Sequence, residues 1–225
     1  MDATRPETDS NAEKHRQAIA VFLDRPLMKY VGFALLLAWH YTLWFTPDFF
    51  FDVQLLDDRV TVSWIVSLLG SSLFLFLIAA LLGRKRRLSD CRMALPVATA
   101  VAVAGTLALG FLPFQLAAAP AYFAIALVIS AAEAVLWILW GERYACIDAS
   151  FTINRIGTVF GLTLFLCVLI AYLLPSLLAA PFAALLPLVS GLALGVTRTD
   201  GRDTFPVLLP RSATKSGFKN MLGVS

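Results

Sequence analysis

Charged residues are scarce in this sequence. Asp, Glu, Lys and Arg make up 15% of its 225 residues, whereas hydrophobic residues make up 59%. Soluble domains are typically about 25% charged and about 45–50% apolar. A compact soluble chain of this length has too little interior to bury so much apolar surface. The composition therefore argues against an ordinary soluble domain and predicts a membrane protein.

The sequence also lacks the residue patterns of most catalytic sites. It has only two histidines, His15 and His40, and neither a His-Glu-x-x-His pattern nor a Gly-x-Ser-x-Gly turn occurs. The glycine-rich loops that bind nucleotide phosphates are absent as well. We therefore expect no enzyme activity, no metal ion and no cofactor.

Cysteine is rare, and its spacing fits no metal site. The three cysteines, Cys91, Cys146 and Cys167, form neither a CxxC pair nor a Cys/His cluster. With two of them expected on the cytoplasmic side and Cys167 within a helix, free thiols are the natural interpretation.

Six apolar stretches are long enough to cross a bilayer, which takes about 20 residues of helix. The predicted spans cover residues 27–45, 62–82, 93–112, 119–140, 157–174 and 177–196. Pro175 separates the last two, because proline cannot continue the hydrogen bonding of a helix. The expected fold is therefore all-α, with one polytopic domain of six transmembrane helices over residues 27–196.

Basic residues are distributed unevenly between these spans. All 18 Lys and Arg residues except Arg59 fall before the first span, after the second, after the fourth, after the sixth, or at the span ends beside these regions. In a six-span chain these four regions share one side of the membrane, and cytoplasmic loops are enriched in Lys and Arg. We therefore expect both chain ends in the cytoplasm and the protein in the inner (cell) membrane.

The densest group of basic residues lies between the second and third spans. It consists of Arg84, Lys85, Arg86 and Arg87. Such a run also occurs in nucleic-acid-binding proteins, but its place between two spans favours a role in topology and contact with anionic headgroups. The expected partner is the lipid bilayer and not nucleic acid.

The two ends of the chain are expected to be cytoplasmic tails, residues 1–26 and 197–225. The first has no short apolar core followed by a cleavage site, so it does not resemble a signal peptide. Residues 12–24 fit either a short amphipathic helix on the membrane surface or a partly ordered tail. Residues 197–225 are polar and without a helical period, so we expect them to be mostly disordered.

Two pairs of glycines predict a helix contact. Gly157 and Gly161 open the fifth span, and Gly191 and Gly195 close the sixth. Glycines four residues apart let two helix backbones approach closely in a membrane. We therefore expect the fifth and sixth helices to touch near the inner leaflet.

Two ionisable residues fall inside the predicted spans. Glu133 lies about two turns inside the fourth span and shares a helix face with Ser130 and Trp137. His40 lies in the outer half of the first span. Ionisable groups at the bilayer centre are costly, so they are candidates for function, and we predict a polar cavity between the first and fourth helices. The alternative is that Glu133 and His40 are structural, since polar side chains also stabilise helix bundles.

One segment resembles part of a known transporter family. Gly83-Arg-Lys-Arg-Arg-Leu88 is similar to the end of the loop between the second and third helices of major facilitator transporters. Residues 79–81 (Ala-Ala-Leu) replace the Gly and Asp of that family, which leaves the gating loop incomplete. The resemblance implies half of a twelve-helix fold, built as a 3+3 repeat. In such a half the first helix of each repeat lines a cavity, and these helices carry His40 and Glu133 here.

A second segment resembles bacterial membrane-bound LuxR-type regulators. Leu136-Trp-Ile-Leu-Trp-Gly-Glu-Arg-Tyr-Ala145 looks like the end of the fourth helix in that family, and the resemblance would cover about residues 30–196. Those regulators join a facilitator-like membrane region to a helix-turn-helix domain, which the residues after Val196 do not resemble. The resemblance implies a half-length or truncated relative, and we expect no DNA-binding domain in this sequence.

Three functions are compatible with these patterns. The leading hypothesis is a sensory or regulatory membrane module. The second is a small transporter, or a transporter half that acts as a dimer, because a six-helix half leaves its cavity face open. The third is a structural partner of another membrane protein. The expected partners are thus a second copy or another membrane protein, and a small-molecule ligand.

Overall fold

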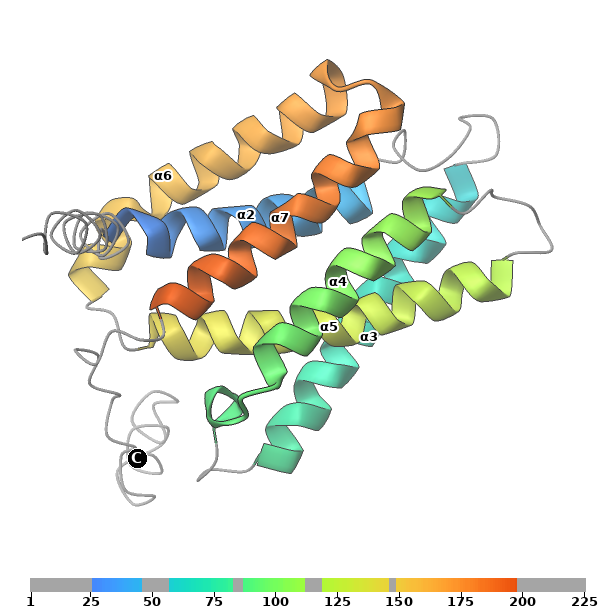
Figure 1. Cartoon of the computed structure of the whole chain (residues 1–225). Coiled ribbons are helices and arrows are strands. Elements are labelled where there is room, and N and C mark those ends of the chain that lie inside the picture. The colour runs from blue at the N-terminus through green and yellow to red at the C-terminus, as the bar shows by residue number, and fades with distance from the viewer. Residues whose placement is uncertain (1–25, 46–56, 83–86, 112–118, 146–148, 198–225) are drawn as a thin grey trace, which may run out of the picture.

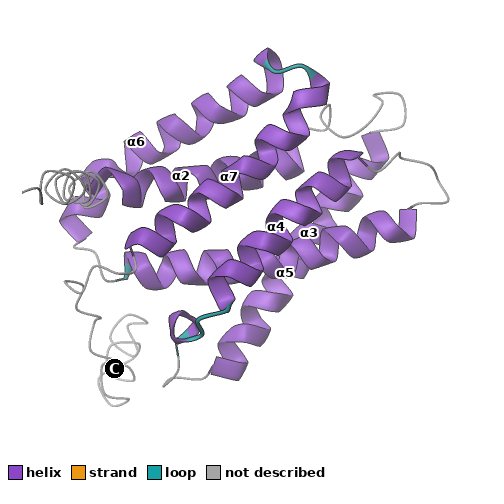
Figure 2. Ribbon diagram, viewed as in Figure 1, coloured by secondary structure: helices purple, strands orange, loops and turns teal. Residues whose placement is uncertain are grey.

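The computed structural model describes residues 26–45, 57–82, 87–111, 119–145 and 149–197, which form helices joined by short turns (Figure 2). The helices are α2 (Pro26–Phe45), α3 (Asp57–Leu82), the 3-10 turn η3 (Leu88–Asp90), α4 (Ala94–Phe111), α5 (Ala119–Tyr144), α6 (Ala149–Val168), the π-helical turn η5 (Leu169–Leu173) and α7 (Ser176–Thr197). No strand occurs in these ranges. The expected all-α class is therefore confirmed for the part of the chain that the structure describes.

Proline marks several of the helix ends. Pro26 opens α2 and Pro120 lies in the first turn of α5. Backbone N–H groups in the first turn have no acceptor within the helix, so a proline there removes no hydrogen bond. Pro175 lies between η5 and α7, as expected from the sequence. Pro181 and Pro187 lie inside α7, a placement that membrane helices tolerate because neighbouring groups satisfy the freed carbonyls.

Four helical segments are long and apolar enough to cross a membrane. They are Ala94–Phe111, Pro120–Tyr144, Arg155–Leu173 and Leu178–Thr197, and Val66–Leu82 is a shorter apolar segment. These segments fall within or close to the predicted third, fourth, fifth, sixth and second spans. The structure therefore indicates a membrane protein.

Several predictions concern residues outside the described ranges. They include the tail at residues 1–25, the basic residues Arg84, Lys85 and Arg86, the thiol of Cys146, and the tail at residues 198–225. Of the basic group, Arg87 is described and lies directly before η3. Cys91 and Cys167 are free thiols, with Cys91 exposed.

The helices pack in two groups of three (Figure 1). In one group, α6 and α7 pack against α2. In the other, α3 and α4 pack against α5, and the contact of α4 with α7 joins the two groups.

These contacts have a regular pattern along the chain. If α2, α3 and α4 are exchanged in order with α5, α6 and α7, the contact of α2 with α7 becomes that of α5 with α4. The contact of α3 with α5 likewise becomes that of α6 with α2, and the contact of α4 with α7 is unchanged. The strongest helix contacts therefore correspond between the first three and the last three helices, whereas the contact of α2 with α3 has no counterpart of similar size between α5 and α6.

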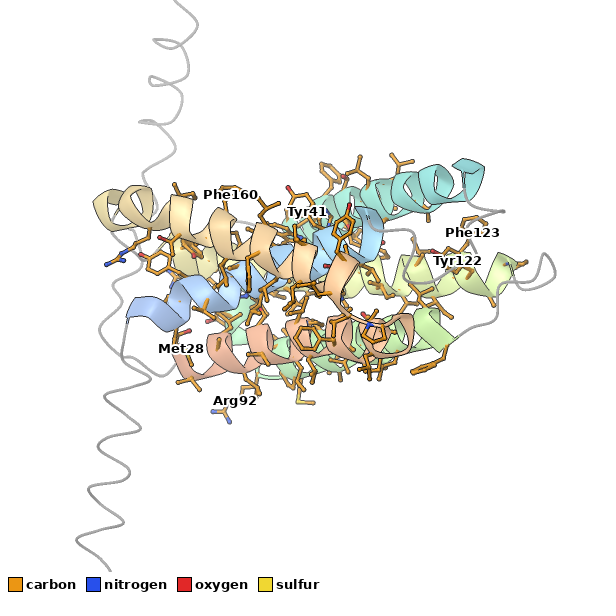
Figure 3. All side chains as sticks on the ribbon, turned by 90° about the horizontal axis from the view of Figure 1, so that it is seen from above. Met28, Tyr41, Arg92, Tyr122, Phe123 and Phe160 are labelled. Carbon is orange, nitrogen blue, oxygen red and sulfur yellow. The ribbon has the colours of Figure 1, made fainter. Side chains whose placement is uncertain are left out.

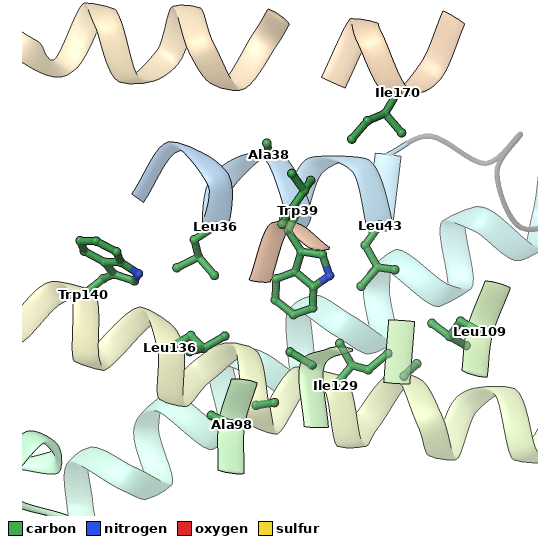
Figure 4. Packing of buried hydrophobic residues seen from close by; sticks show 14 of the residues in the cluster. Leu36, Ala38, Trp39, Leu43, Ala98, Leu109, Ile129, Leu136, Trp140 and Ile170 are labelled. Carbon is green, nitrogen blue, oxygen red and sulfur yellow. The ribbon is translucent and has the colours of Figure 1, made fainter. Parts of the chain in front are cut away.

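The core lies where α2, α5 and the small residues of α4 meet (Figure 4). Leu36 and Trp39 of α2 are fully buried, as are Ile129 and Leu136 of α5. Ala98 of α4 belongs to the same cluster, and its short side chain leaves room for these larger ones. The core therefore holds the two central helices, α2 and α5, in a set relation to each other.

The predicted contact between the two glycine pairs is wrong. A side chain at Gly157 or Gly161 of α6 would meet nothing within 4 Å. Gly191 of α7 instead lies against Thr99 of α4, and Gly195 lies nearest to Leu95, also of α4. The motif does mark a close approach of α7, but to α4, because α2 lies between the packing faces of α6 and α7 and contacts both.

Large apolar side chains cover much of the outer surface. Phe76 of α3 is 75% exposed and Tyr172 of η5 is 83% exposed. The remaining strongly exposed large hydrophobics of α3 and α6 include Leu69, Leu73, Leu81, Leu164 and Phe165. Such a surface is unfavourable in water and suits hydrocarbon, in agreement with the candidate spans.

Candidate functional site between α2, α3 and α5

Glu133 lies near the middle of α5 and is 1% exposed. Its carboxylate has three side-chain partners. Oε1 is bonded to Nδ1 of His40 from α2 and accepts a hydrogen bond from the indole N–H of Trp137 at 3.1 Å. Oε2 accepts a hydrogen bond from the hydroxyl of Ser71 of α3, also at 3.1 Å. Three helices therefore meet at one buried carboxylate.

His40 is the member of this cluster that reaches the surface. Its side chain is 19% exposed, and its ring packs edge-on against Tyr41 and Trp137, with centroids 5.5 and 6.1 Å away. Tyr41 is 40% exposed, so it borders the same opening. The imidazole of His40 is therefore the part of the cluster nearest the molecular surface, while the carboxylate itself stays covered.

Ser130 is buried but does not join the cluster. Its hydroxyl donates to the backbone oxygen of Ala126 at 2.8 Å, one turn earlier in α5. The side chain also faces Gly70 of α3, where an added Cβ would come within 3.1 Å of the Cβ of Ser130. Ser130 therefore takes part in the close approach of α3 to α5 at Gly70. Gly70 directly precedes Ser71, the residue that bonds to Glu133.

Of the predicted cavity residues, the structure brings together Glu133, His40 and Trp137. Sequence reasoning missed Ser71, because α3 contains several serines and nothing in its spacing distinguishes this one. Only the packing of α3 on α5 selects Ser71 as the hydroxyl that reaches the carboxylate.

Aromatic rings continue the site along α2 and α5. Phe33 of α2 packs against Trp137, Trp140 and Tyr144, with centroid distances of 5.7, 6.0 and 4.8 Å. The ring of Trp140 also lies against Gly32, where a Cβ would approach it to 2.6 Å. Aromatic rings of α2 and α5 therefore pack together along the contact of the two helices on one side of Glu133.

A second glutamate of α5 has a different role. Glu142 lies at the end of the helix, and its two carboxylate oxygens accept the backbone N–H groups of Leu88 and Ser89 at 2.8 and 2.9 Å. These N–H groups open the η3 turn and have no partner within it. Glu142 therefore ties the segment between α3 and α4 to the end of α5.

The contacts of the site bring an acid and a base together. A carboxylate and an imidazole in contact can in general exchange a proton, and the hydroxyl of Ser71 and the indole of Trp137 donate hydrogen bonds to the carboxylate oxygens. Within the described residues, no three His, Cys, Asp or Glu side chains gather closely enough to hold a metal ion.

Comparison with known proteins returns no match of any kind. No protein-family model, curated protein or solved structure is significantly similar to the chain. The interpretation of the site therefore depends on its geometry.

Proposed function

We propose that this chain is a six-span sensory or regulatory membrane module whose sensing element is the Glu133–His40 pair. The observation that carries the proposal is a carboxylate with 1% exposure, bonded to an imidazole that reaches the surface. An ionisable group of this kind inside a membrane is costly and marks a functional site by default.

Helix packing supplies the link from protonation to conformation. Glu133 is bonded to α2 through His40 and to α3 through Ser71. Addition of a proton changes which of these bonds the carboxyl group accepts and which it donates. Since α2 and α5 are the central helices of the two groups, a change at their contact alters how the two groups of helices pack against each other.

A 3+3 repeat, as in half of a major facilitator transporter, fits the helix contacts. Trp39 of α2 donates from its indole N–H to the hydroxyl of Thr106 of α4 at 2.9 Å. Trp140 of α5 donates in the same way to Ser190 of α7 at 3.0 Å. The exchange of the two helix triplets turns the first bond into the second, and both tryptophans lie near the C-terminal ends of their helices.

The same arrangement supports six spans, with α2 and α3 as the first two. Both chain ends then lie on the same side of the membrane as Arg87. By the positive-inside rule this is the cytoplasmic side of a bacterial inner membrane. In this proposal the module resembles the membrane region of membrane-bound LuxR-type regulators. It acts through contact with a partner membrane protein.

Transport by a dimer is a second candidate function. The exposed edge of His40 and Tyr41 on α2 favours it, because a cavity-lining helix of a facilitator half presents such groups to the opposite half. In this version a second copy closes the cavity.

The test is a pH titration of the full-length protein in lipid nanodiscs. Tryptophan emission reports on Trp137, which touches both members of the pair, and comparison with Trp137→Phe assigns the signal. We expect the emission to change with pH in the wild type and to be constant in Glu133→Gln and His40→Gln. Glu142→Gln, on the same helix, is the matched control and keeps the response. An unchanged response in Glu133→Gln would refute the sensing role.

A pH-sensitive dye trapped in proteoliposomes separates the two functions. A sensor leaves the internal pH constant after an external acid pulse. Transport predicts acidification that is lost in Glu133→Gln.

A further inference from the structure

A second feature of the bundle lies away from the Glu133 cluster. An open groove of about 530 Å³ runs between α3, α4 and α5. Phe74 of α3, Val97 and Val101 of α4, and Leu127 and Ala131 of α5 line it. This volume is within the range of about 300–1,000 Å³ that small-molecule sites occupy.

The lining restricts what the groove can hold. Apart from the thiol of Cys91 at one end, every lining side chain is a hydrocarbon or a thioether. The part of a ligand that enters must itself lack hydrogen-bonding groups, because a buried polar group without a partner is unfavourable. A hydrocarbon chain meets this condition, and α4 and α5 are both candidate membrane spans, so lipid tails are the medium at this face.

One exposed basic side chain lies at the end of the groove near Cys91. Cys91 and Met93 line the groove, and Arg92 between them is exposed and projects away from the helices (Figure 3). Two acidic residues lie nearby. One oxygen of Asp90, which is exposed, accepts the backbone N–H of Arg87 at 3.3 Å, and both oxygens of Glu142 accept backbone N–H groups of η3. The local carboxylates thus bond to the backbone of this turn.

We propose that this groove binds an acyl chain of an anionic phospholipid, with the phosphate of the headgroup at Arg92. The apolar lining selects the chain, and the guanidinium selects the charge of the headgroup. The proposal is independent of the role of Glu133, whose partners on α2, α3 and α5 do not line the groove.

The experiment titrates the purified full-length protein in neutral detergent with phosphatidylglycerol or phosphatidylcholine. Native mass spectrometry counts the lipids that stay bound. We expect one phosphatidylglycerol to be retained more strongly than phosphatidylcholine. Arg92→Ala should weaken retention of phosphatidylglycerol about fivefold, which corresponds to about 1 kcal/mol for one basic side chain at an anionic headgroup. It should weaken phosphatidylcholine binding less, because the choline cation offsets the charge of the phosphate in that lipid.

A pair of variants on α5 tests the groove itself. Ala131→Phe fills the groove and should abolish retention of the lipid. Ala124→Phe adds the same ring at an exposed position of α5 that does not line the groove, and should retain it. Thermal unfolding of both variants checks that the fold is kept.

Three outcomes would overturn the proposal. They are equal retention of the two lipids by the wild type, equal retention of phosphatidylglycerol by the two phenylalanine variants, and a wild-type dimer that Ala131→Phe converts to a monomer. The last result would identify a second copy of the chain as the occupant.

Discussion

The two halves of the bundle, α2 to α4 and α5 to α7, share their strongest helix contacts but differ in chemistry. Each half contains a tryptophan that donates to a hydroxyl two helices later, Trp39 to Thr106 and Trp140 to Ser190. Yet the second half supplies the buried carboxylate, Glu133, and the first half supplies the imidazole, His40. Corresponding helices can therefore carry different functional groups, because the packing of the helices depends on their contacts and not on which ionisable side chains they carry.

A comparison of the two glutamates of α5 sharpens this point. Glu133 bonds to side chains of three helices, whereas Glu142 bonds to backbone N–H groups of a turn. The bonds of Glu133 depend on how the two halves pack together. The bonds of Glu142 depend only on the position of the η3 turn beside the end of α5.

The largest expected effect comes from removal of the carboxylate between the halves. Glu133→Ala leaves His40, Ser71 and Trp137 without their common acceptor. Buried hydrogen-bonding groups that lose their partner cost about 1–3 kcal/mol each, and we expect the free energy of unfolding to fall by this order. Denaturant titration in detergent, followed by circular dichroism, measures it. Glu142→Ala serves as the comparison and should cost less. A Glu133→Ala protein as stable as the wild type would contradict the assignment.

The next effect tests the joint between the halves. Gly191→Leu places a side chain at the contact of α7 with α4, where even a Cβ would lie 2.9 Å from Cγ2 of Thr99. Overpacking of this kind costs about 1–3 kcal/mol, and we expect a lower temperature of thermal unfolding. An unfolding temperature equal to that of the wild type would show that α4 and α7 are not closely packed.

A smaller effect tests the equivalence of the two tryptophans. Trp39→Phe and Trp140→Phe each remove one indole N–H donor to a buried hydroxyl. Each should lower the free energy of unfolding by about 0.5–1.5 kcal/mol beyond the loss of ring volume. Double-mutant cycles with Thr106→Val and Ser190→Ala isolate this part. A measurable coupling energy in only one of the two tryptophan–hydroxyl pairs would contradict the correspondence between the two halves.

The smallest effect is expected on the outer face of α6. Gly161→Leu adds a side chain where nothing lies within 4 Å, so the free energy of unfolding should change by no more than about 0.5 kcal/mol. This variant is the matched control for Gly191→Leu. Strong destabilisation by Gly161→Leu would show that another element or a second copy covers this face.

Local sequence signals predicted the helices well. Long apolar stretches with Pro175 between the last two led to boundaries close to those of α4 and α7, whereas α6 begins at Ala149, well before the predicted start at Gly157. The glycine pairs also show the limit of such signals. A pair of glycines indicates a close approach of two backbones, but it carries no information about the partner helix, and for α7 the partner is α4 and not α6.

By itself the sequence determined the medium and the elements of this protein, because composition and the length of apolar runs depend only on neighbouring residues. It also singled out Glu133, since an ionisable group in an apolar run is costly wherever it packs. Only the tertiary structure decided that Ser71 bonds to this carboxylate, that Ser130 turns to its own helix, and that Gly191 faces Thr99. The reason is physical: these contacts join residues far apart in the chain, and they depend on how the helices are rotated and which of them lie side by side.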